Sequence, residues 1–139
     1  MKNRGRCIIM FSTLILVILG ANLVLAAEIP RVKAEELKKM IDEGRTDFVV
    51  VDNQPKEAYD MGHVKGAINF PWATQITNPS SLPFNKTLIL YCSCGEDDDS
   101  SLEMAGKLAQ FGYRNVKVLH GGYLKWKELK YPVEKKKTN

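Results

Sequence analysis

Three short apolar runs along the chain predict the strands of its core. They span residues 48–51, 87–91 and 116–119, and Val, Ile and Leu dominate them. Runs this short and this apolar are typical of strands buried on both faces, as in a parallel sheet.

Segments with helical periodicity separate and follow these runs. Residues 33–43, 101–111 and 123–129 repeat apolar side chains every three or four positions. The first segment stops at Gly44 and the second at Gly112, and glycine commonly ends a helix. Because strands alternate with helices, the chain is predicted to be an α/β domain with a central parallel sheet and helices on both faces.

The N-terminal residues follow a different pattern. Residues 1–6 are basic, and residues 7–27 are almost entirely apolar. This arrangement predicts a signal peptide over residues 1–26, with cleavage after Ala26. The alternative is an uncleaved N-terminal anchor, because roughly 20 apolar residues can span a bilayer. Both predict an exported protein, periplasmic or extracytoplasmic, that contacts the membrane only if the leader is uncleaved.

Composition and charge exclude several classes of protein. A chain of 139 residues with 45% apolar and 26% charged residues suits one globular domain and not a disordered chain. The net charge is +4, but all 16 acidic residues lie at Glu28 or later, so part of the excess belongs to the leader. Residues 135–139 are predicted to be a basic, solvated tail. Since this tail holds the only basic run outside the leader, no nucleic-acid partner is predicted.

Cys92 is the candidate for chemistry, because it directly follows the apolar run 87–91. Ligands of parallel sheets bind beyond the carboxyl ends of the strands. There the helix that follows also favours a thiolate or a bound anion. The position suits sulfurtransferases, phosphatases and arsenate reductases alike. The alternative is a buried, unreactive cysteine.

Several sequence fragments together resemble the rhodanese-like family. They occur in family order at residues 52–59, 62–71, 90–95, 111–116, 119–126 and 131–133. The resemblance covers residues 30–134 and implies a rhodanese-like domain and fold. It also places Cys92 where active members carry a persulfide. Because that sulfur travels on the protein, the resemblance implies no cofactor.

The loop after Cys92 departs from the family pattern. The usual loop is Cys-x-x-Gly-x-Arg-Ser, whereas here Gly95 matches and the matching serine is Ser101, three positions later than usual. No Arg or Lys lies between Cys92 and Ser101, and Gln54 stands where the family commonly has arginine. A phosphoryl group needs such a cation in its transition state, so a phosphatase is not expected. The longer loop predicts a larger substrate.

The loop is also acidic from residue 96 to residue 99. One interpretation is that Asp98, Asp99 and Ser100 cap a helix that begins near Ser101. Even as caps, the carboxylates are expected to repel thiosulfate and to disfavour the thiolate, so neutralising Asp97 and Asp98 should favour thiosulfate. We also expect the loop to contribute only surface, so that its shortening costs little stability. The predicted loop and substrate residues are Ser93, Gly95, Glu96, Asp97, Asp98, Asp99, Ser100 and Ser101.

Cys94 leaves four interpretations open. It can be a redox partner of Cys92, the thiol that resolves a persulfide on Cys92, a soft-metal ligand or a spectator. Two thiolates are too few for a closed zinc site and His63 is distant in the chain, so no metal is predicted. Asp52 and His63 are predicted to support the site, the first by fixing loops and the second by bonding the backbone. Trp72 either lines the mouth of the site or only packs against neighbouring side chains.

The leading hypothesis is an exported sulfurtransferase that carries sulfur as a persulfide on Cys92. Its partners would be a small sulfur donor and a thiol acceptor, either a small molecule or a protein. The alternatives are thiol–disulfide or persulfide redox exchange through Cys92 and Cys94, and a catalytically silent binding module.

Overall fold

The structure is a computed structural model that describes residues 28–95 and 97–136. The predicted leader and residue 96 lie outside the described residues, as do positions 137–139 of the predicted tail. Over the described ranges, no helix combines the length and the apolar composition that crossing a membrane requires.

A five-stranded, all-parallel sheet forms the centre of the domain, as predicted. Its order is β1-β6-β5-β2-β4, and the three predicted apolar runs are its three inner strands. The two edge strands have only two residues each and carry no periodicity that a sequence pattern could reveal. The strands are β1 (Arg31–Val32), β2 (Phe48–Asp52), β4 (Ile68–Asn69), β5 (Thr87–Tyr91) and β6 (Val116–Leu119).

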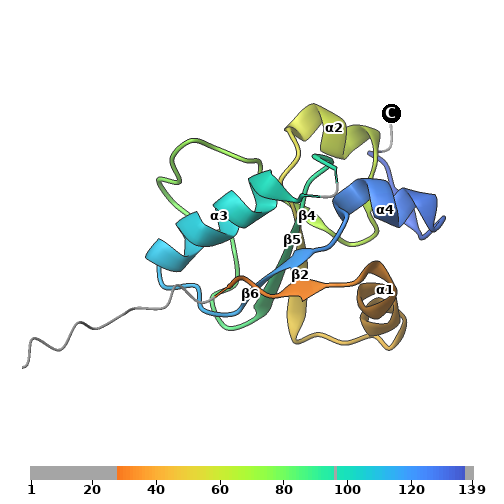
Figure 1. Ribbon diagram of the computed structural model, residues 1–139, viewed down its shortest axis with the longest axis horizontal. Coiled ribbons are helices and arrows are strands. Elements are labelled where there is room, and N and C mark those ends of the chain that lie inside the picture. The colour runs from red at the N-terminus through yellow and green to blue at the C-terminus, as the bar shows by residue number, and fades with distance from the viewer. Residues whose placement is uncertain (1–27, 96, 137–139) are drawn as a thin grey trace, which may run out of the picture.

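Helices cover both faces of this sheet (Figure 1). Three correspond to the predicted helical segments, and α2 follows Pro55 without having been predicted. It has no buried residue, so it lacks the apolar periodicity by which the others are recognised. A separate antiparallel pair joins β3 (His63–Val64) to β7 (Val133–Glu134). The helices are α1 (Ala34–Asp42), α2 (Lys56–Met61), α3 (Asp99–Gln110) and α4 (Gly122–Glu128).

The alternating side chains of the inner strands divide the core in two. Ile89 points to the face covered by α1 and α4, where Trp126 is fully buried. Leu88 and Leu90 point to the opposite face, where they pack under Leu108 of α3. Burial of one such apolar side chain contributes about 1.5–3 kcal/mol, so both layers stabilise the sheet.

The sheet also fixes where the candidate site forms. Asp52 at the end of β2 is in register with Tyr91 at the end of β5. Residues 53 and 92, which follow these two strands, therefore emerge side by side at the carboxyl ends of the strands. The loop from Cys92 then leads into α3, so the first turn of α3 faces the same end of the sheet (Figure 1).

Candidate active site

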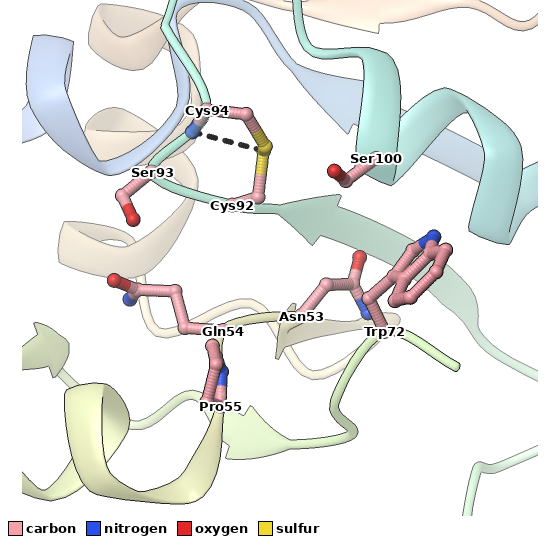
Figure 2. Close-up of a pocket in the computed structure, with 8 residues that line it drawn as sticks. All are labelled: Asn53, Gln54, Pro55, Trp72, Cys92, Ser93, Cys94 and Ser100. Atoms are coloured by element: carbon pink, nitrogen blue, oxygen red, sulfur yellow. Dashed lines mark hydrogen bonds between the residues drawn. A yellow bond between two sulfur atoms is a disulfide. The ribbon is translucent and has the colours of Figure 1, made fainter. Parts of the chain in front are cut away.

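Cys92 lies at the carboxyl end of the central strand, beside a pocket of about 270 Å³. Only 4% of Cys92 is exposed. Figure 2 shows Gln54 and Ser93 on one side of the pocket and Trp72 on the other, with the hydroxyl of Ser100 directed toward the cysteines. The described residues that line the pocket carry no charge. They are Asn53, Gln54, Pro55, Trp72, Cys92, Ser93, Cys94 and Ser100.

The two cysteines of the loop form a disulfide. Their environments differ, because Cys94 is exposed while Cys92 is buried. The backbone N–H of Cys94 also donates a hydrogen bond to Cys92 Sγ at 3.3 Å (Figure 2). The loop therefore holds both sulfurs together at the pocket, which is the arrangement that redox exchange or persulfide resolution needs.

The turn before α4 holds the backbone of Cys92 in place. The N–H of Tyr123 donates to the carbonyl oxygen of Cys92 at 2.8 Å. Gly122, with φ +51°, allows this close approach, because a Cβ atom there would lie 2.4 Å from the same oxygen. The contact of Gly122 with Cys92 joins residues 30 positions apart, so no local sequence pattern could predict it.

Asp98 has a structural role that the sequence did not reveal. Only 1% of it is exposed, and its backbone adopts the left-handed region at φ +58°. Its Oδ2 accepts a hydrogen bond from the Gly121 N–H at 3.3 Å and lies 3.5 Å from His120 Nδ1 and 3.8 Å from Arg31 Nε. Burial raises the pKa of Asp98, while these three neighbours oppose the shift. The carboxylate thus fastens the active-site loop to the turn before α4.

These contacts bear on three expectations about the acidic loop. Helix α3 begins at Asp99, near the expected start, but no described side chain caps it, although Asp98 occupies the N-cap position, so the capping interpretation is wrong. Asp97 and Asp99 are exposed, and neither they nor Asp98 lines the pocket, so their expected repulsion of thiosulfate stays a prediction. The loop also makes buried contacts through Asp98, so its expected contribution of surface alone is wrong. Glu96 lies outside the described residues.

The other predicted loop residues divide between the pocket and its support. Ser93 and Ser100 line the pocket, while Ser101 is fully buried in the first turn of α3. The N–H of Ser101 donates to the carbonyl of Asp98 at 3.0 Å. Gly95 lines a neighbouring hollow beside the Gly121 turn. Ser101 therefore anchors the loop and does not face the pocket.

Asp52 organises the floor of the site from a fully buried position. It accepts hydrogen bonds from the backbone N–H of Gln54 at 2.7 Å, from Gln54 Nε2 at 2.9 Å and from the Tyr91 hydroxyl at 2.5 Å. Burial raises the pKa of Asp52, and the hydrogen bonds from Tyr91 and Gln54 oppose the shift. Asp52 thus positions Gln54 at the pocket wall, in line with its predicted role in fixing loops.

His63 bonds the backbone, as predicted. Its Nδ1 donates to the carbonyl oxygen of Tyr59 at 2.8 Å, and the two rings stack with centroids 3.8 Å apart. His63 is buried and does not line the pocket. Through Tyr59, it ties α2 to the start of β3.

Trp72 lines the pocket, which decides between its two interpretations. Its Nε1–H donates to Glu103 Oε2 at 2.8 Å, and Lys107 Nζ lies 4.9 Å from the ring centroid. Asn53 on the same wall was missed, because an asparagine after a strand is common. Its Nδ2 donates to the Phe70 carbonyl at 2.8 Å, while its buried Oδ1 has no partner among the described residues.

A second hollow of about 620 Å³ adjoins the pocket and shares Gln54 and Ser93 with it. Lys127 and Lys135 contribute positive charge, and the exposed side chain of Met61 is apolar. These residues come from α2, α4 and the C-terminal segment, so only the fold brings them together. Over residues 28–95 and 97–136, no group of three His, Cys, Asp or Glu side chains is placed to hold a metal ion.

The fold and site define a class of parallel α/β domains whose active-site cysteine lies at the carboxyl end of the central strand, in a loop before a helix. The family model of the rhodanese-like domain matches residues 33–129. The chain therefore belongs to the rhodanese-like domain family.

Two proteins that are similar in sequence to this chain are named as sulfurtransferases. The adenylyltransferase and sulfurtransferase UBA4 of Meyerozyma guilliermondii is 32% identical over 58% of this chain and 20% of its own length. A putative thiosulfate sulfurtransferase of Mycolicibacterium smegmatis is 28% identical over 68% of this chain and 39% of its own length. The chain thus spans well under half of either protein. These matches support a sulfurtransferase-type role.

A solved structure agrees with the fold. The rhodanese-like domain of an Anabaena protein is 26% identical, with a TM-score of 0.67. The match covers 76% of this chain and 79% of that one. The predicted α/β fold is therefore confirmed.

Proposed function

We propose that the protein is an exported sulfurtransferase that carries sulfur on Cys92 and passes it to a thiol acceptor. The observation that carries the proposal is the position of Cys92, whose sulfur lies at the pocket and accepts the N–H of Cys94. The reduced Cys92 thiolate attacks the outer sulfur of a donor, the rest of the donor leaves, and a persulfide remains. The amide that faces Sγ stabilises the negative sulfur before and after transfer.

The lining of the pocket favours a donor of low charge. Thiosulfate is a dianion that releases sulfite, and none of the described lining side chains offers a cation to either. A persulfide or polysulfide of low charge fits this uncharged lining better.

A second candidate function is thiol–disulfide exchange, which the disulfide between Cys92 and Cys94 favours. Here the bonded pair accepts electrons from an outside thiol and needs no sulfur donor. A binding module without chemistry is the remaining alternative. It would use the same loop as a recognition surface.

Mass spectrometry of the intact chain separates these functions. The reduced full-length protein, with Cys7→Ser to remove the leader thiol, is exposed to inorganic tetrasulfide and then to a thiol. Sulfur transfer adds about 32 Da to Cys92 in a variant that also carries Cys94→Ser, and the added thiol removes it. Exchange alone leaves that variant unchanged and makes only the Cys94-containing protein about 2 Da lighter. Cys92→Ser should abolish the adduct. An unchanged mass in every sample would contradict both chemical functions and leave the binding module.

Export is supported by the apolar leader and its small residues before Glu28. N-terminal sequencing of the protein from an extracytoplasmic fraction should begin at Ala27. An intact Met1 in the membrane fraction would contradict cleavage and favour the anchor.

A further inference from the structure

The two bonded cysteine residues differ in their exposure to solvent. Cys92 is 4% exposed at the end of the central strand, whereas Cys94, two residues later, is exposed. A reagent from solution therefore reaches the sulfur of Cys94 more easily than that of Cys92. The Cys94 sulfur in turn reaches Cys92 Sγ directly, since the two are bonded.

We propose that Cys94 resolves the Cys92 persulfide by attacking its inner sulfur, so that the carried sulfur leaves as hydrogen sulfide and a dithiol then reduces the resulting disulfide. This inference rests on the proposed function, because it needs the persulfide on Cys92. It makes the chain a dithiol-dependent reductase of sulfane sulfur. An outside thiol acceptor then competes with Cys94 for the same persulfide.

The resolving step is balanced in atoms and electrons. The Cys94 thiolate forms a bond to Cys92 Sγ, and the bond from Sγ to the carried sulfur breaks. The carried sulfur leaves with the bonding electrons and its proton as HS⁻. The two cysteine sulfurs are oxidised to a disulfide, and the sulfane sulfur is reduced to sulfide by two electrons.

Two features favour attack on the inner sulfur. The observed bond joins Cys94 to Cys92 Sγ itself, and this bond is the product of that attack. Attack on the outer sulfur would instead move the persulfide to Cys94. The leaving group also matters, because exchange is faster when the departing sulfur is the weaker base. Hydrogen sulfide is a stronger acid than a cysteine thiol, so HS⁻ leaves readily.

The exposure of Cys94 determines how the chain is reduced. A thiolate of the dithiol attacks the accessible Cys94 sulfur, and Cys92 leaves as a thiolate that still accepts the N–H of Cys94. The second thiol of the reductant then attacks the mixed disulfide and frees Cys94. The dithiol becomes a disulfide, and Cys92 is ready for another donor.

A single-turnover experiment tests the inference on the full chain. The reduced Cys7→Ser protein is incubated with thiosulfate, without any free thiol, until loading is complete. Thiosulfate is used because each loaded persulfide releases one sulfite, so sulfite counts the loaded sites even if loading is slow. Sulfide is measured in the same sample, and intact mass reports the state of the cysteines. The matched variant adds Cys94→Ser, and inorganic tetrasulfide is a second donor for the mass measurement.

The Cys94-containing protein should release about one sulfide per sulfite and end about 2 Da lighter than the reduced chain. The Cys94→Ser variant should release at least tenfold less sulfide per sulfite and keep the adduct of about 32 Da. Added dithiothreitol should then release its sulfide. If both proteins keep the adduct equally, the inference is wrong and the proposed function stands. If neither donor loads the Cys94→Ser variant, both are wrong.

Discussion

The carbonyl oxygen of Cys92 accepts a hydrogen bond from the N–H of Tyr123, at 2.8 Å. This bond joins the candidate nucleophile to the first turn of α4, so the position of the sulfur depends on how closely that helix approaches. Gly122 sets the approach, because it is the residue whose missing side chain leaves room for the carbonyl.

Gly122→Ala should therefore damage both stability and sulfur loading. Its new Cβ would meet Cys92 O at 2.4 Å, at a backbone φ of +51°. We expect the free energy of unfolding in urea to fall by about 2–4 kcal/mol, from steric overlap and left-handed strain together. The rate of adduct formation on Cys92 should fall more than tenfold.

Gly44→Ala is the matched control, since Gly44 has φ +65° and a Cβ added there would have no atom within 4 Å. It should lose only about 1–2 kcal/mol and keep its loading rate. Equal losses in the two variants would show that backbone strain, and not the contact with Cys92, explains the effect.

Asp98→Ala should destabilise the protein by about 1–3 kcal/mol, because it leaves the buried N–H of Gly121 without its acceptor. Asp98→Asn keeps an acceptor and tolerates the left-handed backbone, so its loss should be smaller. Urea unfolding at about pH 7 compares the variants. Equal losses would mean that the acceptor contributes nothing.

The same residue predicts a pH dependence. Burial raises the folded-state pKa of Asp98 above its unfolded value. Its contribution to stability is therefore fully present below the unfolded pKa and is lost as the pH rises through the folded pKa. Relative to Asp98→Asn, the wild-type protein should therefore become more stable as the pH falls from about 7 to about 3. A constant difference between the two proteins would contradict the shift.

The central sheet could be predicted from the sequence, whereas the contacts of the active-site loop could not. Continuous apolar runs identified β2, β5 and β6, and the rule that ligands bind at strand ends then pointed to Cys92. No local pattern marks a two-residue strand or a polar helix such as α2. Asp98 is buried because its own left-handed backbone turns its carboxylate toward Gly121, 23 positions away. An acidic run in sequence does not reveal such a turn.

Ser93→Arg should improve thiosulfate as a donor. Ser93 is exposed at the uncharged pocket, so an arginine there supplies the missing cation without entering the core. One charge pair at about 4 Å in water contributes roughly 1 kcal/mol, which corresponds to a gain of about fivefold in kcat/KM. The gain should shrink as salt is added. Ser93→Gln, of similar reach and no charge, should show no gain, and a gain with Gln would remove charge as the cause.

The lysines of the second hollow should select acidic thiol acceptors. Lys127→Glu with Lys135→Glu should lower kcat/KM for glutathione, whose net charge is negative, by about fivefold or more at low salt. The rate with uncharged 2-mercaptoethanol should stay within twofold. Lys86→Glu, directly before β5 and so at the amino end of the central strand, is the control. If it has the same effect, overall charge and not this hollow governs the preference.

The two-residue edge strands β1 and β4 have a consequence for the protein in crowded solution. A long exposed edge offers a row of unpaired backbone groups to which a neighbouring molecule can add its own strand. Here each edge offers room for only two residues, and Arg31 places a charge on one of them. The domain therefore resists edge-to-edge association into fibrils through the brevity of its sheet margins.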